Sequence, residues 1–300
     1  MQATIVRRYG GPEVLELVEV ETPEPGAAEV RIAVAGAAVN PADLAIRAGY
    51  LESIIQGRLP VGLGWDAAGT IDALGSGVTG FAIGDRVVAL VDRFVSPYNA
   101  YATQVVVPAA AVAAAPAGIE LAAAATLPLN AQTAAQALDL AALEPGQTLL
   151  VVGAAGAVGE YAVALAAQRG VKVIGLARAA DEEGVLATGA SQFVTALDEV
   201  RGVDGVLDTA GLGAPALAAV RDGGTFIAVS DASTPAAERG IRVDTVHVQH
   251  DGAQLAELVR EVEAGRLRLR VAGTYPLAEA GVVHDLVAPG GVRGRYVLIP

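Results

Sequence analysis

A glycine-rich turn between an apolar run and an alanine-rich segment is the clearest chemical feature of the sequence. The run Thr148–Val152 leads into glycines, and Glu160 to Gly170 then has the apolar spacing and the glycine stop of a helix. In such a strand–turn–helix unit, small residues let the backbone approach a pyrophosphate, which the free N–H groups of the first helical turn face. The stretch therefore predicts a dinucleotide site lined by Gly153, Ala155, Gly156, Ala157, Val158 and Gly159.

The match to the G-x-G-x-x-G pattern is incomplete, because Ala154 stands at the place of its first glycine. With 36 glycines in the chain, an ordinary loop is the alternative interpretation. The ordered sequence of strand, turn, helix and second strand favours the cofactor site.

The second strand, Val171 to Ala177, ends at a cation, Arg178. NAD sites usually place Asp or Glu there to hold the ribose hydroxyls, whereas an arginine suits the 2′-phosphate of NADPH. Arg178 therefore favours NADPH. A solvated surface arginine is the alternative, and nearby Asp181 keeps NADH open.

Composition excludes several other kinds of chemistry. The 300 residues contain no cysteine and only three histidines, so disulfides, thiolate nucleophiles and cysteine-ligated metals are excluded. His247 and His250 fit a solvated strand or loop better than a metal site. A formal net charge of −13 argues against nucleic acid or an anionic membrane as the main partner.

No membrane span or signal peptide is predicted either, and a cytoplasmic location is the expectation. The long uncharged stretch from Phe94 to Ile119 is interrupted by prolines and polar residues, and the N-terminus lacks an apolar core.

The elements that would position the turn divide into two kinds. Up to about residue 120, strands rich in valine and isoleucine alternate with Gly and Pro breakers, as in 15–20 and 30–39. Residues 120–250 alternate short helices and strands, which is typical of a parallel doubly wound sheet. Pro128 is expected to separate two helices there, and 253–264 has the pattern of an amphipathic packing helix.

Several further segments identify a family. The chain resembles the zinc-independent quinone oxidoreductase branch of the medium-chain dehydrogenases/reductases. The matching segments follow the family's order over nearly the whole chain: Tyr9–Leu17, Val39–Asp43 with Arg47–Gly49, Gly64–Gly69, Gly84–Val88, Ala154–Gly159, Asp208–Gly211, Gly223–Gly224 and Val292–Leu298.

This resemblance implies an α/β fold with two domains. Residues 1–119 and 251–300 would form a GroES-like, β-rich catalytic domain, and residues 120–250 a Rossmann domain that binds NADPH. Zinc would be absent. The family's zinc-binding members carry a Cys near the position where this chain has Val39–Asn40, and a His-Glu pair where it has Trp65–Asp66, and neither set of ligands is present here. Family precedent adds further cofactor residues: Asn130, Thr133, Ala210, Val229 and Ser230. A strand within 240–250 makes a homodimer plausible, although it is equally compatible with coverage by its own chain.

On the substrate side, Asn40 is the first candidate, because its amide can donate to a carbonyl as charge develops there. The alternative is that Asn40 only shapes the Asn-Pro turn. Tyr50 is a weaker candidate donor. Asp43 fits a helix cap better than a general base, and Trp65 fits core packing better than the wall of a substrate cleft.

These features together predict an NADPH-dependent reductase of quinones or similar conjugated carbonyls. An enoyl or alkenal double-bond reductase uses the same cofactor and carbonyl clamp. A binding protein with little turnover, acting as a sensor or in a structural role, is the alternative outside enzyme chemistry.

Overall fold

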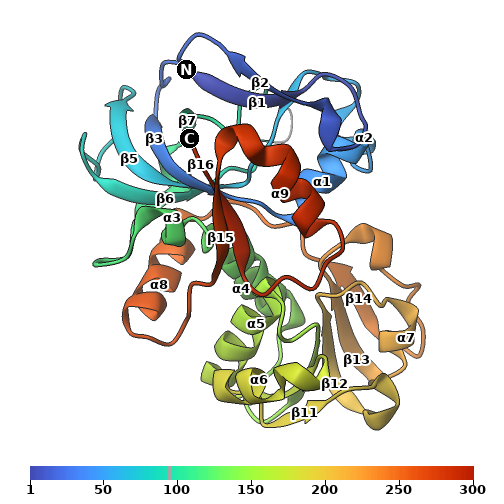
Figure 1. Ribbon diagram of the computed structural model, residues 1–300. Coiled ribbons are helices and arrows are strands. Elements are labelled where there is room, and N and C mark those ends of the chain that lie inside the picture. Colours follow the sequence, from blue (N-terminus) through green and yellow to red (C-terminus); the bar gives the residue numbers. More distant parts are fainter. Residues whose placement is uncertain (94–95) are drawn as a thin grey trace. The chain divides into compact units, whose positions relative to one another are not determined.

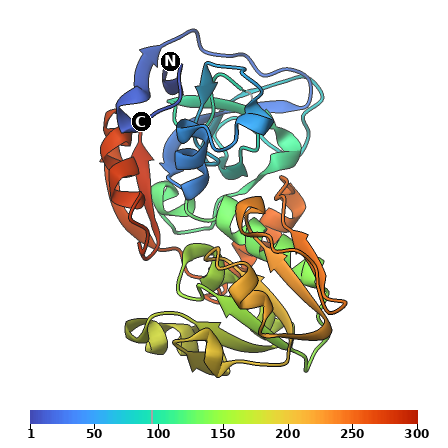
Figure 2. The same ribbon diagram turned by 90° about the vertical axis from the view of Figure 1, so that its right-hand side faces the viewer.

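The computed structural model describes residues 1–93 and 96–300. The first two residues of the uncharged stretch, Phe94 and Val95, lie outside the described residues. Among the described helices, none combines the length and the hydrophobicity needed to span a bilayer. The chain forms two compact units, one made of residues 1–129 and 249–300 and the other of residues 130–248 (Figures 1 and 2).

The first unit is built on antiparallel β-structure. A small sheet has the order β2-β1-β4, and a larger one follows the path β15-β16-β3-β5-β6-β8, with β7 paired to β3. The strands are β1 (Gln2–Val6), β2 (Leu15–Glu19), β3 (Glu29–Ala38), β4 (Val61–Gly62), β5 (Asp66–Leu74), β6 (Arg86–Leu90), β7 (Gln104–Pro108), β8 (Val112–Ala114), β15 (Val271–Pro276) and β16 (Arg295–Ile299). The helices of this unit are α1 (Pro41–Ala48), α2 (Glu52–Ile55), α3 (Leu121–Ala124), α8 (Gly252–Glu263) and α9 (Ala280–Val287).

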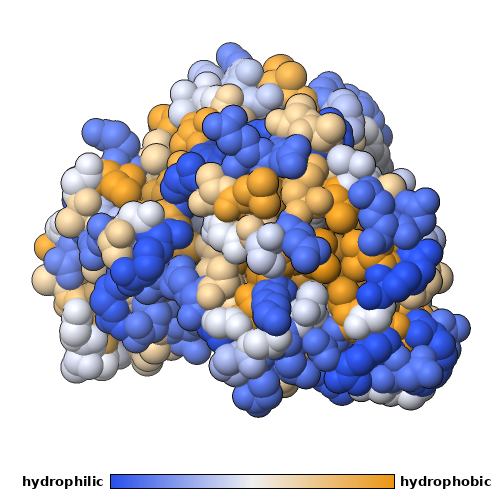
Figure 3. Space-filling view, turned by 90° about the horizontal axis from the view of Figure 1, so that it is seen from below, coloured by the Kyte–Doolittle hydropathy of each residue, from blue (hydrophilic) through white to orange (hydrophobic). Residues whose placement is uncertain are grey.

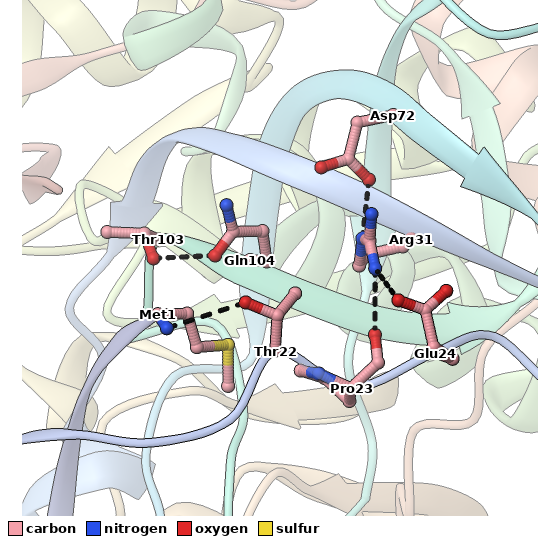
Figure 4. A network of polar contacts seen from close by, with 8 residues as sticks. All are labelled: Met1, Thr22, Pro23, Glu24, Arg31, Asp72, Thr103 and Gln104. Atoms are coloured by element: carbon pink, nitrogen blue, oxygen red, sulfur yellow. Dashed lines mark hydrogen bonds and ion pairs between the residues drawn. The ribbon is translucent and has the colours of Figure 1, made fainter.

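Arg31 fastens the outer part of this sheet (Figure 4). From β3, its Nε donates to Asp72 on β5 at 2.7 Å, and its Nη1 donates to the Pro23 carbonyl oxygen at 3.2 Å and to Glu24 at 2.9 Å. The Arg31 side chain is only 14% exposed and Asp72 32%, so this pair is less screened than a surface ion pair, whereas Glu24 is 79% exposed. The bonds of Arg31 attach the segment before β3 to the sheet.

The C-terminal strand completes the same sheet. β16 pairs antiparallel with β3 through Val297–Ala38 and Leu298–Ala37, and parallel with β15 (Figure 1). The end of the chain therefore lies in the sheet of the first unit. β15 and α9 were not predicted.

The second unit contains a parallel sheet with the order β11-β10-β9-β12-β13-β14. Its strands are β9 (Thr148–Val152), β10 (Lys172–Leu176), β11 (Gln192–Val194), β12 (Val203–Asp208), β13 (Val220–Ala228) and β14 (Arg242–Thr245). Its helices are α5 (Ala157–Gln168), α6 (Glu182–Thr188) and α7 (Ala214–Leu217), and α4 (Pro128–Ala141) leads into it. From β9 the chain adds β10 and β11 toward one edge of the sheet, then returns to β12 on the other side of β9 and adds β13 and β14 toward the opposite edge. This change in winding places α5 and α6 on one face of the sheet and α7 on the other (Figure 1).

Pro128 does not separate two helices as expected, because it is the first residue of α4. Proline fits that position since its missing N–H would have no helical partner there. The predicted helix before it is a single turn, α3.

The surface carries apolar side chains among polar ones, as the 53% hydrophobic composition requires (Figure 3). Tyr50 and Ile83 are the most exposed of the large hydrophobic residues in the described ranges, at 83% and 67%.

Candidate active site

The glycine turn between β9 and α5 has the tight geometry that its composition predicts. Gly153 adopts a left-handed conformation (φ 79°), and Gly156 is the N-cap of α5 and donates its N–H to the Gly153 carbonyl oxygen at 2.9 Å. A Cβ at Gly159 would overlap the same carbonyl oxygen and come within 2.9 Å of Ala154 Cα. The helix therefore begins against the turn, with its first N–H groups at the strand's carboxyl end.

The end of β10 is bonded directly to this turn. The N–H groups of Gly153 and Ala154 donate to the Leu176 carbonyl oxygen at 3.0 and 3.1 Å. Arg178 follows two residues later, with a side chain that is 67% exposed and Nε 3.9 Å from Asp181 Oδ2. Arg178, which the sequence suggested as a contact to a 2′-phosphate, therefore lies at the same sheet edge as the glycines.

The loops after β12 and β13 complete this edge. The buried carboxylate of Asp208 accepts N–H groups from Ala210, Gly211 and Gly213 at 2.7–3.2 Å, which holds the loop in a tight curve. Thr209 Oγ1 donates to the Val152 carbonyl oxygen at 2.7 Å, so the loop lies against the end of β9.

The remaining predicted cofactor residues fall in two places. Val229 and Ser230 follow the end of β13, next to β12 in the sheet, and Ala155, Ala157 and Val158 belong to the glycine turn or to the first turn of α5. Asn130 and Thr133 are buried in α4, at 1% and 8% exposure. The structure thus gathers the turn, Arg178, Ala210, Val229 and Ser230 at the carboxyl edge of one sheet.

In the first unit, Asn40 follows β3 and is the N-cap of α1. The residue is 1% exposed, and its amide Nδ2 donates to Asp66 Oδ2 at 2.6 Å and to the Ala38 carbonyl oxygen at 3.3 Å. Arg295 Nε donates to Asn40 Oδ1 at 2.8 Å. The amide is therefore oriented by a carboxylate on one side and a guanidinium on the other.

Asp43 fastens the start of α1. Its buried carboxylate accepts the Asn40 N–H at 2.9 Å and the Gly64 N–H at 2.7 Å. It caps the helix from the third helical position, as the sequence favoured over a general base. Burial raises the pKa of Asp43 from 3.8 to about 7, against the lowering effect of those two N–H groups.

Tyr50 lies apart from Asn40 within this unit. It follows Gly49, the C-cap of α1, so the eight-residue helix separates the two residues by roughly 12 Å along its axis. The 83% exposure of Tyr50 also contrasts with the burial of Asn40.

A buried polar chain near α1 was missed by the sequence analysis. Tyr101 Oη lies 3.4 Å from His284 Nε2, and His284 Nδ1 lies 3.4 Å from Arg47 Nη1. Burial, with a smaller effect of the nearby Arg47 charge, lowers the pKa of His284 from 6.5 to about 3, so this ring is neutral near pH 7. No local pattern signals the chain, because 183 residues separate Tyr101 from His284.

The groups around Asn40 do not fit a zinc ion. Both oxygens of Asp66 accept hydrogen bonds, from the Leu129 N–H at 2.6 Å and from Asn40. Trp65 beside it offers no ligand atom. Within residues 1–93 and 96–300, no group of three or more His, Cys, Asp or Glu side chains lies close enough to hold a metal ion.

Family models match both units. Residues 26–117 match the alcohol dehydrogenase GroES-like domain, and residues 180–298 match a model described as zinc-binding dehydrogenase. A quinone oxidoreductase from Pseudomonas aeruginosa is 30% identical over 97% of this chain and 97% of its own length. The chain belongs to the quinone oxidoreductase branch of the medium-chain dehydrogenases/reductases.

Other members of the superfamily are similar over the whole chain. An NADPH-dependent alkenal/one oxidoreductase from Arabidopsis thaliana is 28% identical over 100% of this chain and 80% of its own length. Among solved structures, the quinone oxidoreductase from Coxiella burnetii has a TM-score of 0.89 at 28% identity, covering 100% of this chain and 99% of the other. A mycobacterial protein complexed with NADPH has a TM-score of 0.84 at 28% identity, with full coverage of both chains.

The predicted fold class, a β-rich GroES-like domain with a doubly wound parallel sheet, is confirmed by these matches and by the two sheets. The boundaries between the two units along the chain lie at 129/130 and 248/249, whereas the sequence placed them at 119/120 and 250/251.

Proposed function

We propose that this chain is an NADPH-dependent reductase that transfers a hydride to a quinone or a similar conjugated carbonyl, without zinc. The observation that carries the proposal is the Asn40 amide, held between Asp66 and Arg295. A hydride acceptor gains negative charge on its carbonyl oxygen, and an oriented N–H donor stabilises that charge.

The second unit fits NADPH. Gly153 and Gly156 carry no side chain before the first turn of α5, so a pyrophosphate could approach the backbone N–H groups there. Arg178 at the end of β10 would pair with the 2′-phosphate. Relatives named for NADPH support the choice. When bound, the cofactor supplies the hydride.

Asn40 is the proposed contact to the acceptor. Its 2.6 Å bond to Asp66 fixes one amide hydrogen, while the other is held by the longer 3.3 Å bond to Ala38. The longer bond is the weaker one, and a substrate carbonyl would replace it. Arg295, by bonding Oδ1, keeps Nδ2 turned in the donating sense.

An alkenal or enone reductase is the second candidate, favoured by the similarity to the Arabidopsis thaliana enzyme. Both reactions begin with the same hydride transfer and need the same carbonyl donor. A homodimer also belongs to the proposal, since β14 ends the strand order of its sheet, and a mass measurement by sedimentation tests it. A cytoplasmic location stays a prediction.

Anaerobic oxidation of NADPH, with NADH in parallel, tests the proposal against a panel of quinones and α,β-unsaturated ketones. We expect turnover with NADPH preferred, unchanged after chelator treatment. Stoichiometric NADPH binding with no oxidation by any acceptor would contradict it and favour a binding protein. Loss of activity that zinc restores would refute the zinc-free assignment.

Two variants assign the donors in the same assay. Asn40→Ala is expected to lower turnover about 10- to 100-fold with NADPH affinity unchanged, as for loss of one oriented donor. Tyr50→Phe removes only a hydroxyl from an exposed ring: lost turnover would make Tyr50 a donor, and an unchanged rate would exclude it.

A further inference from the structure

His250, in the loop between β14 and α8, pairs with Asp92, which follows β6, and the proposed hydride step does not use this pair. His250 Nδ1 lies 2.9 Å from each carboxylate oxygen of Asp92, and the His250 backbone N–H donates to Oδ2 at 3.0 Å. Because a carboxylate accepts, Nδ1 carries the hydrogen. Nε2 is then the ring nitrogen that Asp92 does not bond, and no described residue hydrogen-bonds it.

A second pair nearby in the sequence shows what an ordinary surface contact looks like. His247 Nε2 lies 3.5 Å from Asp231, with both side chains about 70% exposed, so this pair is weak and screened. The side chains of His250 and Asp92 are only 31% and 17% exposed. His250 is therefore held in one orientation and still reachable.

The topology of the first unit places Asp92 at the same sheet edge as Asn40. β3 and β6 both pair antiparallel with β5, so the end of β3, the start of β5 and the end of β6 meet. Asp66 pairs with Leu90 in this register, and the Val91 N–H donates to the Trp65 carbonyl oxygen at 2.7 Å. Asp92 thus leaves the sheet two strands from Asn40, roughly 10 Å away.

We propose that His250, oriented by Asp92, is the proton donor for reduction of an α,β-unsaturated carbonyl. This inference rests on the proposed function and selects its substrate class. Hydride adds to the β-carbon, the C=C electron pair shifts, and the carbonyl oxygen takes up the charge as an enolate near Asn40. The α-carbon then forms a C–H bond with the Nε2 proton, and neutral His250 regains a proton from solvent.

The two substrate classes need this donor unequally. A reduced quinone carries its charge on oxygen, where solvent protonates it directly. An enolate must be protonated on carbon, which is slower and has two faces, so a positioned acid affects both rate and stereochemistry. The role of His250 is therefore visible as a difference between acceptors.

The test uses the full chain with His250→Gln, Asp92→Asn and the matched control His247→Gln. Single-turnover rates are measured with a benzoquinone and with an α-methyl enone, together with NADPH affinity and the enantiomeric excess of the reduced enone. Imidazole ¹⁵N shifts report independently whether Nδ1 carries the hydrogen.

We expect His250→Gln to lower the enone rate at least 10-fold and to abolish the enantiomeric excess. The quinone rate should change less than about 3-fold, and NADPH affinity should be unchanged. Asp92→Asn should shift the His250 tautomer and lower the enone rate, while His247→Gln should behave as wild type.

Two results overturn the inference. Equal losses on quinone and enone would show that His250 has only a structural role, and an unchanged enone rate and enantiomeric excess would exclude it as the donor. If the wild type reduces neither class, the proposed function fails and the donor role fails with it. An active wild type with an unaffected His250→Gln removes the donor role alone.

Discussion

At the residue scale, charged side chains act here mainly by orienting a neutral group. Asn40 carries no charge, yet Asp66 and Arg295 hold its amide from opposite ends. Burial raises the pKa of Asp66 from 3.8 to about 7, while the Leu129 N–H, the Asn40 amide and the Arg295 charge oppose this rise. The proposed donor is thus oriented by charged groups while it carries no charge itself.

Arg178 makes the clearest prediction at this scale. Arg178→Ala should weaken NADPH binding about 10- to 100-fold, because charge-assisted hydrogen bonds to the 2′-phosphate are lost, and should change NADH binding less than about 3-fold. Fluorescence titration of both cofactors measures the difference.

Arg169→Ala is the matched control. Arg169 is an ion-paired arginine of the same unit, bonded to Asp139 at 2.8 Å, but it lies at the other end of α5 from the glycine turn. We expect it to leave both affinities unchanged. If Arg178→Ala weakens NADPH and NADH equally, Arg178 does not contact the 2′-phosphate.

At the element scale, the β9–α5 turn depends on a helix that starts unusually close to its strand. Gly159 lies in the first turn of α5, where any Cβ meets backbone atoms of Gly153 and Ala154. Neither atom can move without separating the helix from the strand that it follows. The glycine is therefore required by packing, independently of the phosphate.

Gly159→Ala should lower both stability and cofactor affinity. The overlap costs about 1–3 kcal/mol of unfolding free energy, and displacement of the first turn should weaken NADPH at least 10-fold. Denaturant unfolding and cofactor titration measure the two effects.

Gly184→Ala serves as the control, because Gly184 lies in α6 with nothing within 4 Å of its Cβ position. Alanine should stabilise this helix slightly. An equally mild effect of both substitutions would mean that the Gly159 contact is not tight.

How far the sequence predicts these elements depends on how local their signals are. The β9–α5–β10 unit is contiguous, so its apolar run, glycines and helix stop identify it, and the position of Arg178 follows. The contacts that orient the Asn40 amide are not local in the sequence, since Arg295 lies 255 residues away from Asn40. α9 brings His284 next to Tyr101 and Arg47, which lie 183 and 237 residues earlier, so only the folded structure reveals this cluster. Pro128 suggests a break between helices in the sequence because proline is common both after helix ends and at helix starts.

At the scale of the whole molecule, the first unit buries more titratable groups than its site requires. Asp43 and Asp66 have their pKa values raised to about 7, whereas that of His284 is lowered to about 3. Desolvation is the leading cause for all three, and Arg295, Arg47 and Tyr101 are the other charged or titratable groups that face them. These shifts link folding of the first unit to pH.

The sign of that link follows from the protons bound in each state. From about pH 4 to 6.5 the folded state keeps two carboxyl protons that the unfolded chain loses, and lacks one histidine proton that the unfolded chain gains. The folded state thus binds a net one proton more, and stability falls as pH rises, by roughly 1.4 kcal/mol per pH unit. Below about pH 3.8 only His284 differs, and stability falls on further acidification.

Two variants separate these contributions, with Trp65 fluorescence reporting the first unit because it is the chain's single tryptophan. Asp43→Asn lowers stability throughout by misplacing a donor against the Gly64 N–H, but it removes one carboxyl and should flatten the fall between pH 4.5 and 6.5. His284→Gln removes the opposing group and should make that fall about twice as steep. Equal slopes for both variants and the wild type would mean that these groups titrate normally in the folded protein, and that the buried cluster is open to water.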